Sequence, residues 1–423
     1  MINKNILEIT ENNLCTGCGT CIPLCPSKAI KIQINSKKGI YIPNVNKLKC
    51  NGCGICYQIC PGSEIDFEGL NKDIFNKKIE DPIIGSYIKS FTGYSKDPHI
   101  RYNSSSGGLI TQILIFALNN NIIDGALVTR MRKDKPLEPE PFIARTEEEI
   151  IEASGSKYCP VPTNMVLDEI IKSSNEKFAV VGLPCQITGI RKAELINKTL
   201  KDKIILHIGI LCNHTPNLVA TEYFLYSKKI NNNNIKKINY RSGGWIPKME
   251  ITFKNNESIL ENYWGDGFGQ FFYPIRCTLC CDIFALLSDI SFGDAWLPEI
   301  EKIDKIGTSL IIIRNSRGEN ILKKVLSKDK LTLNPLIHEK LLKSQFDKVY
   351  FKNISLITRM NILKFFRKEI PFYKIPTYNY NYKNTDYLNS IFLYIILNVS
   401  LKRYMWPLMT NLIKIFKKIK KIE

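Results

Sequence analysis

Short apolar runs alternate with helical patterns through the middle of the chain. The β-branched runs 125–131, 178–182 and 204–211 are typical of buried strands, and a segment with helical periodicity follows each one. Such alternation favours an α/β core with a largely parallel sheet. Further strands are predicted at residues 235–240, 249–253, 289–294 and 308–314, and a further helix at 319–326.

Two predicted helix starts carry capping signals. The serines of the segment from Ser104 to Gly108 can cap the apolar helix expected at 109–118. A glycine-rich helix start offers free amides and is suited to binding an anion such as a phosphate, although an ordinary capped core helix has the same pattern. The segment from Thr146 to Glu149 has the capping-box pattern and predicts a short helix.

The densest chemical signal lies between Cys15 and Pro61. The pattern C-x2-C-x2-C-x3-C-P occurs twice there, and it is the ligand spacing of bacterial ferredoxins. In that arrangement three cysteines hold one 4Fe-4S cluster, and the cysteine before the proline binds the other cluster. Two sets of cluster ligands are therefore predicted: Cys15, Cys18, Cys21 and Cys60 for one cluster, and Cys50, Cys53, Cys56 and Cys25 for the other.

Zinc knuckles and disulfides are the competing interpretations of these cysteines. Zinc sites prefer isolated CxxC pairs, and disulfides do not need a doubled spacing. The chain carries 14 cysteines, and residues 1–10 lack the apolar core of a secretory signal. We therefore expect metal binding in a reducing, cytoplasmic compartment. Between the two cysteine motifs, the alternating segments 30–34 and 39–42 predict a short hairpin.

The net charge of +19 favours an acidic partner: a phosphate compound, an acidic electron carrier, anionic lipid or nucleic acid. Nothing in the chain resembles a nucleic-acid-binding module, so we expect no nucleic-acid partner. Much of the charge lies in residues 402–423, after an apolar run at 388–401 that is too short to cross a membrane. We expect this tail to dock as a helix on the protein or on a partner, with peripheral contact at a membrane surface as the alternative.

Six cysteines lie outside the doubled motif: Cys159, Cys185, Cys212, Cys277, Cys280 and Cys281. Cys277 and Cys280 form a CxxC pair. Cys185 and Cys212 follow predicted strands, where open α/β sheets place their sites. Four such thiolates could complete a third 4Fe-4S site, and the alternative is buried free cysteines, which are common in protein cores.

A family resemblance bears on this choice. It rests on the segments 106–111, 155–158, 182–186, 189–192, 209–212, 277–282 and 289–291. In these, the chain from about Tyr87 to Leu326 resembles the β subunit of coenzyme F420-reducing hydrogenase, with relatives among F420H2 dehydrogenase input subunits and formate dehydrogenase β subunits. The resemblance implies that this region binds FAD and one further 4Fe-4S cluster.

The resemblance also implies roles for individual residues. It makes Cys185, Cys212, Cys277 and Cys280 the ligands of the third cluster and leaves Cys159 and Cys281 as spectators. It implies flavin contacts from Ser106, Gly107, Gly108, Ser156, Lys157 and Tyr158. Arg191 and Lys192 are candidates for neutralising phosphates. No catalytic residue is assigned.

The expected architecture is α+β and has four parts. These are a 2x(4Fe-4S) ferredoxin-type domain at 1–67, a linker at 68–86, a larger mixed α/β domain for FAD and 4Fe-4S at 87–346, and a basic, helical C-terminal extension at 347–423. The expected function is an oxidoreductase that passes electrons between a hydride-type substrate, coenzyme F420 or similar, and one-electron carriers through FAD and three clusters. The alternative is an electron-transfer subunit without a substrate of its own that feeds a partner reductase.

Overall fold

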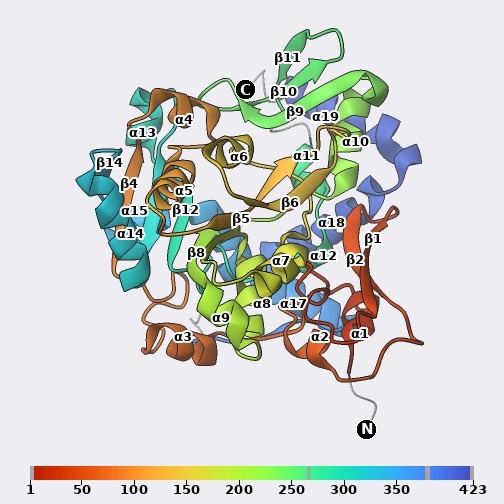
Figure 1. The fold of residues 1–423 in the computed structure, drawn as a ribbon. Helices are drawn as coiled ribbons and strands as arrows, with labels where there is room; N and C mark the ends of the chain where they lie inside the picture. Colours follow the sequence, from red (N-terminus) through yellow and green to blue (C-terminus); the bar gives the residue numbers. More distant parts are fainter. Residues whose placement is uncertain (1–3, 264–266, 377–381, 420–423) are drawn as a thin grey trace.

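An eight-stranded sheet forms the centre of the molecule in the computed structural model, which describes residues 4–263, 267–376 and 382–419 (Figure 1). The strand order is β14-β4-β13-β12-β8-β7-β5-β6. The strands are β4 (Lys89–Ser95), β5 (Gly125–Met131), β6 (Pro139–Ala144), β7 (Phe178–Gly182), β8 (Ile204–Ile210), β12 (Ile290–Asp294), β13 (Ser309–Ile313) and β14 (Leu331–Pro335).

The predicted largely parallel sheet is a mixed sheet. The central strands β12, β8, β7 and β5 are parallel, whereas β13, β4 and β14 on one side and β6 on the other pair antiparallel. The antiparallel pairing of β5 with β6 follows from chain length. Residues 132–138 connect them, and a parallel crossover needs about a dozen residues or more. The expected α+β class with a mixed α/β domain is confirmed.

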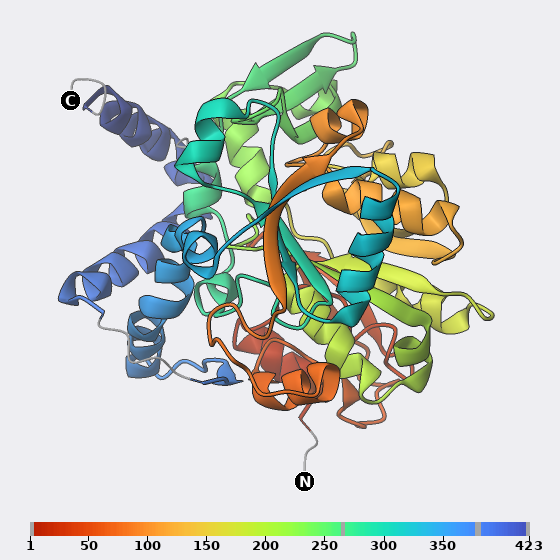
Figure 2. The ribbon, with the colours of Figure 1, turned by 90° about the vertical axis from the view of Figure 1, so that its left-hand side faces the viewer.

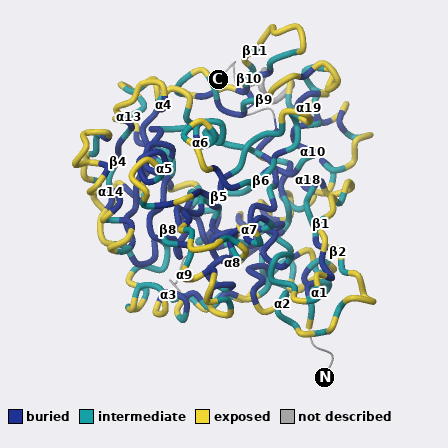
Figure 3. Tube along the Cα trace, viewed as in Figure 1, coloured by how far each residue is buried: buried dark blue, intermediate teal, exposed yellow. Residues whose placement is uncertain are grey.

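Helices cover both faces of this sheet, and neighbouring residues of one strand point to opposite cores. On one side Leu127 and Val180 pack in the core that contains α7 (Leu167–Lys172), α8 (Pro184–Glu194) and α9 (Lys198–Lys203). On the other side Ala126 and Ala179 pack in the core that contains α5 (Leu109–Asn119), α6 (Glu147–Glu152) and α14 (Ser316–Ser327). The sheet therefore lies in the buried interior of the chain trace (Figure 3).

A second, smaller sheet has its own core. Its strands β9 (Ile235–Ser242), β10 (Lys248–Phe253) and β11 (Ser258–Glu261) are antiparallel and pack with α10 (Leu218–Ser227) and α11 (Phe268–Phe271). Three short helices lie elsewhere along the chain: α4 (Pro98–Asn103) between β4 and α5, α12 (Ile275–Thr278) between α11 and β12, and α13 (Pro298–Ile303) between β12 and β13.

The ferredoxin-like module occupies one corner of the molecule (Figure 1). It comprises α1 (Ile6–Glu11), β1 (Ile30–Asn35), β2 (Ile40–Val45), α2 (Ile55–Gln58) and β3 (Glu64–Asp66). The predicted hairpin forms, with Ile30 opposite Val45. At its turn, Gly39 has φ +62° and a side chain there would lie 2.7 Å from Val219, so the tip packs tightly on α10.

The predicted linker begins instead with a packed helix. Helix α3 (Phe67–Phe75) starts where the Asp66 carboxylate accepts a hydrogen bond from the Gly69 amide at 2.9 Å. Phe67 and Leu70 lie on one face and are buried in the main core. The i, i+3 spacing of these two residues outweighs the polar composition of the rest of the stretch.

The C-terminal region is helical, as expected, and folds back onto the molecule. It contains α15 (His338–Lys343), α16 (Phe346–Val349), a π-helical turn (Tyr350–Ile354), α17 (Leu356–Phe365), β15 (Phe372–Lys374), α18 (Asn384–Ser400) and α19 (Trp406–Ile419). Strand β15 pairs in parallel with β3 of the ferredoxin-like module. The last two helices lie along one flank of the molecule (Figure 2), where α18 contacts α17, and Trp406 and Met409 of α19 are buried in the core of the smaller sheet. Within the described residues, no helix has both the length and the apolar character needed to cross a bilayer.

Candidate iron–sulfur and flavin sites

One cavity brings together the four cysteines that the family resemblance assigns to a third cluster. Cys185 lies in the first turn of α8 after β7, Cys212 follows β8, and Cys277 and Cys280 lie in and after α12. All four line a cavity of about 890 Å³, a volume that includes its open mouth. Burial raises the pKa of the Cys212 thiol to about 12 and that of Cys185 well above its usual value. A compensating positive charge is therefore needed to keep these groups as thiolate ligands.

Lys352 supplies positive charge at this cavity from the π-helical turn. Its ammonium is buried and donates hydrogen bonds to the Cys280 sulfur at 3.3 Å and to the carbonyls of Cys212 at 2.9 Å and Asp282 at 2.8 Å. Burial alone would lower the pKa of Lys352, but Cys280 and Cys212 outweigh it and raise that pKa above its usual value. A hydrogen bond from a charged donor to a thiolate is among the strong ones.

The Cys277–Cys280 loop is held from two sides. The buried guanidinium of Arg276 donates to the carbonyls of Gly62 at 2.8 Å and Pro61 at 2.9 Å, which lie in the ferredoxin-like module. From the C-terminal region, Arg359 donates to the Thr278 carbonyl at 2.7 Å, and Tyr373 donates to the Leu279 carbonyl at 2.7 Å. Three separate parts of the chain thus fix this loop.

Four cysteines of the ferredoxin-like module line one cavity. Cys25, Cys50, Cys53 and Cys56 line a second cavity of about 370 Å³, which also includes open solvent. Burial raises the pKa of the Cys21 thiol well above its usual value, and the neighbouring Cys18, Cys15 and Cys60 raise it further. Backbone amides donate to sulfur in both sets, from Gly62 to Cys60 at 3.2 Å and from Ala29 to Cys25 at 3.3 Å.

The set formed by Cys15, Cys18, Cys21 and Cys60, here called the Cys15 set, lies directly beside the third cavity. The Asn164 amide donates to the Cys18 carbonyl at 2.9 Å, and its side-chain amide donates to the Thr20 hydroxyl at 2.8 Å and to the Gln186 carbonyl at 2.8 Å. A side chain at Gly189 would lie 2.4 Å from the Thr20 oxygen, so α8 and the cysteine loop pack without a gap. After burial, Cys18 raises the pKa of Cys185 most, and Cys56 also raises the pKa of Cys21, so the Cys15 set lies between the other two cysteine sets.

The segments expected to contact the flavin also meet. The Ser156 amide donates to the Ser105 hydroxyl at 2.5 Å, which joins the 155–158 loop to the start of α5. The predicted serine caps are wrong, because the N-cap of α5 is Gly108, at φ 75°, and no side chain caps the helix. Ser106 instead donates to the Thr308 carbonyl at 2.9 Å. Among the described residues, no side chain caps the first-turn amides of α5, so these amides are available to an anion.

All three basic residues considered for the flavin or its phosphates make other contacts, and two of them bind backbone carbonyls. Lys157 donates to three carbonyls of its own loop, those of Ala153, Ser154 and Gly155, and burial lowers its pKa to about 7. Lys192 donates to the Cys60 and Glu64 carbonyls, both at 2.8 Å. Lys157 therefore shapes its loop, and Lys192 fastens the ferredoxin-like module to α8 instead of neutralising a phosphate.

Arg191, the third, belongs to a buried ionic network beneath the sheet end. It donates to Glu194 at 3.1 Å and Asp289 at 2.9 Å, while His207 bridges the same two carboxylates at 2.7 and 3.1 Å. Burial alone would raise the pKa of Asp289, but Arg191 and His207 hold it well below its usual range. This network links α8, β8 and the residue before β12. It engages the Arg191 guanidinium, which was a candidate for neutralising a phosphate.

The remaining unusual residues lie around the third cavity or in the small-sheet core. Cys281 lines the third cavity, whereas Cys159 is buried in the core of the smaller sheet. His214 stacks on Tyr273 with ring centres 4.1 Å apart, and burial lowers its pKa to about 4.

Three residues that hold the third site carry no sequence signal. Lys352, Arg359 and Tyr373 are single basic or aromatic residues, which are common on helices and strands. Their hydrogen bonds to the ligand loop emerge only from the tertiary fold.

Comparison with known proteins identifies the larger region. Residues 90–168 match the family described as coenzyme F420 hydrogenase/dehydrogenase, beta subunit N-term, and residues 175–339 match the corresponding C terminus. Residues 14–63 match the 4Fe-4S dicluster domain. The first two matches together span more than half of the chain.

Individual relatives agree with these matches. The chain is 29% identical over 250 residues to coenzyme F420 hydrogenase subunit beta of Methanothermobacter thermautotrophicus, covering 58% of this chain and 83% of that protein. It is 26% identical over 343 residues to a component of the F(420)H(2) dehydrogenase of Methanosarcina mazei, covering 78% of this chain and 87% of that protein.

The fold is also found in a solved structure. A chain of the F420-reducing [NiFe] hydrogenase complex from Methanosarcina barkeri matches with a TM-score of 0.56 and 24% identity, over 69% of this chain and 98% of that chain. The expected family resemblance is confirmed. The chain is an iron–sulfur, oxidoreductase-type member of the family of coenzyme F420 hydrogenase/dehydrogenase beta subunits, with a 4Fe-4S ferredoxin domain at its N-terminal end.

Proposed function

We propose that this protein passes electrons between a hydride-type substrate, coenzyme F420 or a similar compound, and one-electron carriers, through FAD and three 4Fe-4S clusters. The proposed parts are the ferredoxin-type domain at 1–67, the flavin and cluster domain at 87–346 and the extension at 347–423. The observation that carries the proposal is the third cavity. Cys185, Cys212, Cys277 and Cys280 come from three distant segments and line one space beside the Cys15 set. Four cysteines are the usual ligand set of a 4Fe-4S cluster.

The surrounding residues suit a buried, charged group. Lys352 donates to the Cys280 sulfur and offsets negative charge, as described above. Arg276 fixes the ligand loop against the ferredoxin-like module. Both side chains are buried, so they support the positions of the ligands from within the protein.

FAD would be held where the start of α5 meets the 155–158 loop. The uncapped amides after Gly108 suit the pyrophosphate, and Ser106, Gly107, Ser156 and Tyr158 lie on the two segments that meet there. When bound, FAD supplies the step between two-electron hydride chemistry and single-electron transfer. Lys157 contributes by holding the loop through its three carbonyl contacts.

The partner we propose is a redox protein or a small electron carrier. The names of relatives as hydrogenase and dehydrogenase subunits support a protein partner. A cytoplasmic protein with peripheral membrane contact through its tail is also proposed. The exposed faces of Leu388, Phe392 and Ile395 on α18 support that contact. Co-sedimentation with anionic vesicles, compared between the full chain and a Phe392→Ser, Ile395→Ser variant, tests it.

Anaerobic purification with iron, sulfide and flavin quantitation tests the core of the proposal. Three clusters of four irons predict about twelve iron atoms and one FAD per chain. Oxidation of reduced F420 with viologen as the acceptor is expected to follow from that composition. A preparation that holds its full iron but binds no flavin when FAD is added would contradict the flavin assignment.

The second candidate is an electron-transfer subunit with no substrate of its own, which feeds a partner reductase. The series of cysteine sets supports this function as well as the first, because an electron-transfer subunit needs no substrate site. Bound FAD that neither reduced F420 nor reduced nicotinamide can reduce would favour this alternative. Reduction of the bound flavin by F420H2 would favour the first proposal.

A further inference from the structure

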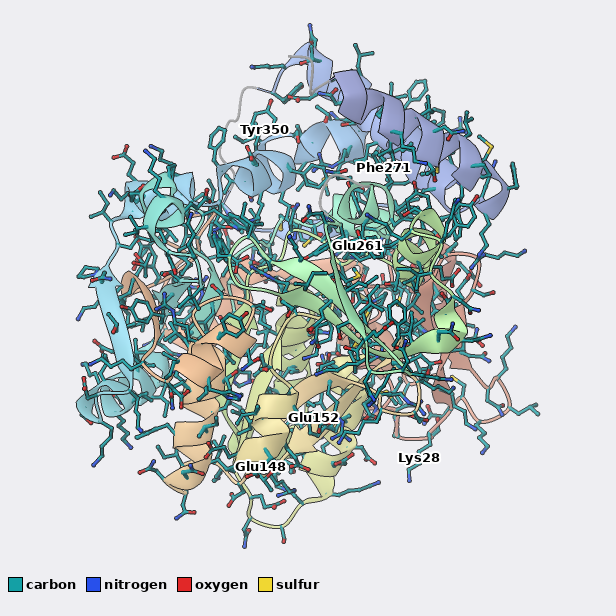
Figure 4. All side chains as sticks on the ribbon, turned by 90° about the horizontal axis from the view of Figure 1, so that it is seen from above. Lys28, Glu148, Glu152, Glu261, Phe271 and Tyr350 are labelled. Carbon is teal, nitrogen blue, oxygen red and sulfur yellow. The ribbon has the colours of Figure 1, made fainter. Side chains whose placement is uncertain are left out.

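The cysteine-bearing part of the ferredoxin-like module carries positive charge only. Between Asn12 and Ser63 the sequence contains no Asp and no Glu. The lysines of this stretch are Lys28, Lys31, Lys37, Lys38, Lys47 and Lys49, and all six are exposed. Lys28 lies at the edge of the molecule in Figure 4. A surface of one sign attracts partners of the opposite sign over several ångströms and speeds their association.

The outer cysteine set lies where this charge meets solvent. All 14 cysteines are among the described residues, and only Cys53 is exposed. The loop that leads to Cys50 presents Lys47 and Lys49 on either side of Leu48, which is 99% exposed. We call Lys47, Leu48, Lys49 and Cys53 the outer face. It combines two cations, an apolar contact and the closest approach to a cysteine ligand.

Neither of the other two cysteine sets contains an exposed cysteine. Cys18, Cys21 and Cys60 are buried, and the remaining members are of intermediate exposure: Cys15, Cys185, Cys212, Cys277 and Cys280. The third set is covered by Arg276 and by the buried Lys352, which belongs to the C-terminal region. A large protein carrier would therefore meet the outer set before either of the others.

We propose that the outer face docks an acidic protein that carries a one-electron iron–sulfur centre. This inference rests on the proposed function, because it requires a cluster on Cys25, Cys50, Cys53 and Cys56. Carboxylates of the carrier would face Lys47 and Lys49, and an apolar contact would form on Leu48. In the transfer, the outer cluster is oxidised by one electron and the carrier's centre is reduced by one. No bond forms or breaks, and no proton moves.

Charge and redox chemistry together favour this occupant. Anionic lipid and nucleic acid would also be attracted to the lysines, but neither accepts an electron from a cluster. The single exposed leucine offers little area for insertion into a bilayer. A small acidic carrier needs only a weak, transient interface, which is typical of electron-transfer partners.

A charge-reversal pair with a matched control tests the proposal. The test variant is Lys47→Glu with Lys49→Glu, and the control is Lys37→Glu with Lys38→Glu. Both change the net charge equally, but the control residues lie beside Gly39 at the other end of the hairpin, where the turn packs on α10. Each protein is reduced with dithionite, desalted anaerobically and mixed with an acidic clostridial-type ferredoxin in a stopped-flow instrument.

The test variant is expected to lose about ten-fold in the second-order rate at low ionic strength, whereas the control loses about two-fold or less. The wild-type rate should fall as salt is added. Reduction of methyl viologen, a small dication, should not fall in either variant. Equal losses in the two variants would overturn the outer face as the docking site.

Carbodiimide cross-linking provides a readout that does not depend on electron transfer. Cross-links from the ferredoxin carboxylates to Lys47 or Lys49 are expected, and cross-links confined to other lysines would overturn the proposal. Binding of anionic vesicles or of nucleic acid that displaces the ferredoxin from Lys47 and Lys49 would assign the face to that competitor instead. Failure of the proposed hydride chemistry appears separately, because the reaction starts from chemically reduced clusters.

Discussion

The third cavity and the outer cysteine set are built in opposite ways. The outer set uses Cys25 and a single short segment from Cys50 to Cys56, and Cys53 reaches the surface. The third cavity draws its cysteines from residues 185–280 and is closed by Lys352, a buried cation from the C-terminal region. A site encoded by local spacing can sit at the surface and exchange electrons outward. A site assembled from distant segments depends on the whole core. Its surroundings can shield it from external carriers and set its reduction potential.

Removing one ligand from each site gives the largest expected contrast. Cys185→Ser should remove the third cluster, about a third of the iron, and stop electron flow from flavin to the ferredoxin-like module. Cys53→Ser should leave flavin-to-cluster transfer in place and slow only the reduction of external acceptors. Iron quantitation and stopped-flow absorbance with a chemical reductant measure both effects. Full iron together with unchanged transfer in Cys185→Ser would refute the third site.

The next effect tests whether the third cavity depends on the core. Asp289→Asn removes a carboxylate that pairs with Arg191 and His207, and the buried Arg191 loses a partner. We expect the free energy of unfolding to fall by about 3–5 kcal/mol at neutral pH, because a buried ion pair is broken and Glu194 is then the carboxylate left beside Arg191. Urea denaturation under anaerobic conditions measures this loss.

An exposed ion pair provides the control for that variant. Glu222→Gln breaks a contact with Arg403 at the surface, and it should cost less than about 1 kcal/mol. Iron release at low urea should begin with the third cluster in Asp289→Asn, since Cys212 follows β8 and Cys277 and Cys280 precede β12. Simultaneous release of all the iron would show instead that the two kinds of site share one unfolding unit.

A smaller effect tests whether Lys352 sets the reduction potential of the third cluster without being needed for cluster assembly. Lys352→Met removes the ammonium beside the Cys280 sulfur. Positive charge favours the reduced, more negative cluster, so its loss should lower the reduction potential by roughly 40–90 mV, equivalent to about 1–2 kcal/mol. Redox titration followed by electron paramagnetic resonance measures the shift. Lys352→Arg should restore most of it, and an unchanged potential in Lys352→Met with intact iron would contradict the tuning role.

The same contrast explains what the sequence could predict. The hairpin at 30–45, the strands that end before Cys185 and Cys212, and the two ferredoxin ligand sets follow local rules of periodicity and spacing. The antiparallel edges of the sheet and the helix at Phe67–Phe75 could not be predicted from local patterns. Strand direction and the burial of Phe67 and Leu70 depend on the tertiary fold. Lys352 was not predicted for the same reason. Its hydrogen-bond partners lie 70 to 140 positions away in the chain.

The smallest expected effect lies where the two kinds of site meet. The Thr20 hydroxyl accepts from the Asn164 side chain at 2.8 Å and lies 3.2 Å from the Cys18 sulfur. Thr20→Val keeps the shape and removes the hydroxyl, so the free energy of unfolding should fall by about 0.5–1.5 kcal/mol, the net value of a neutral hydrogen bond. Thr20→Ser retains the hydroxyl and is the matched control for that loss.

Iron content and flavin-to-cluster transfer should be unchanged in Thr20→Val, because the packing against Gly189 is kept. This outcome would show that the junction between the middle and third sets is held by several contacts, including the Asn164–Gln186 bond, and not by one polar group. A large loss of transfer with full iron would place Thr20 on the electron path itself. The Thr20–Asn164 hydrogen bond would then control the distance between the two cysteine sets, although other contacts surround it.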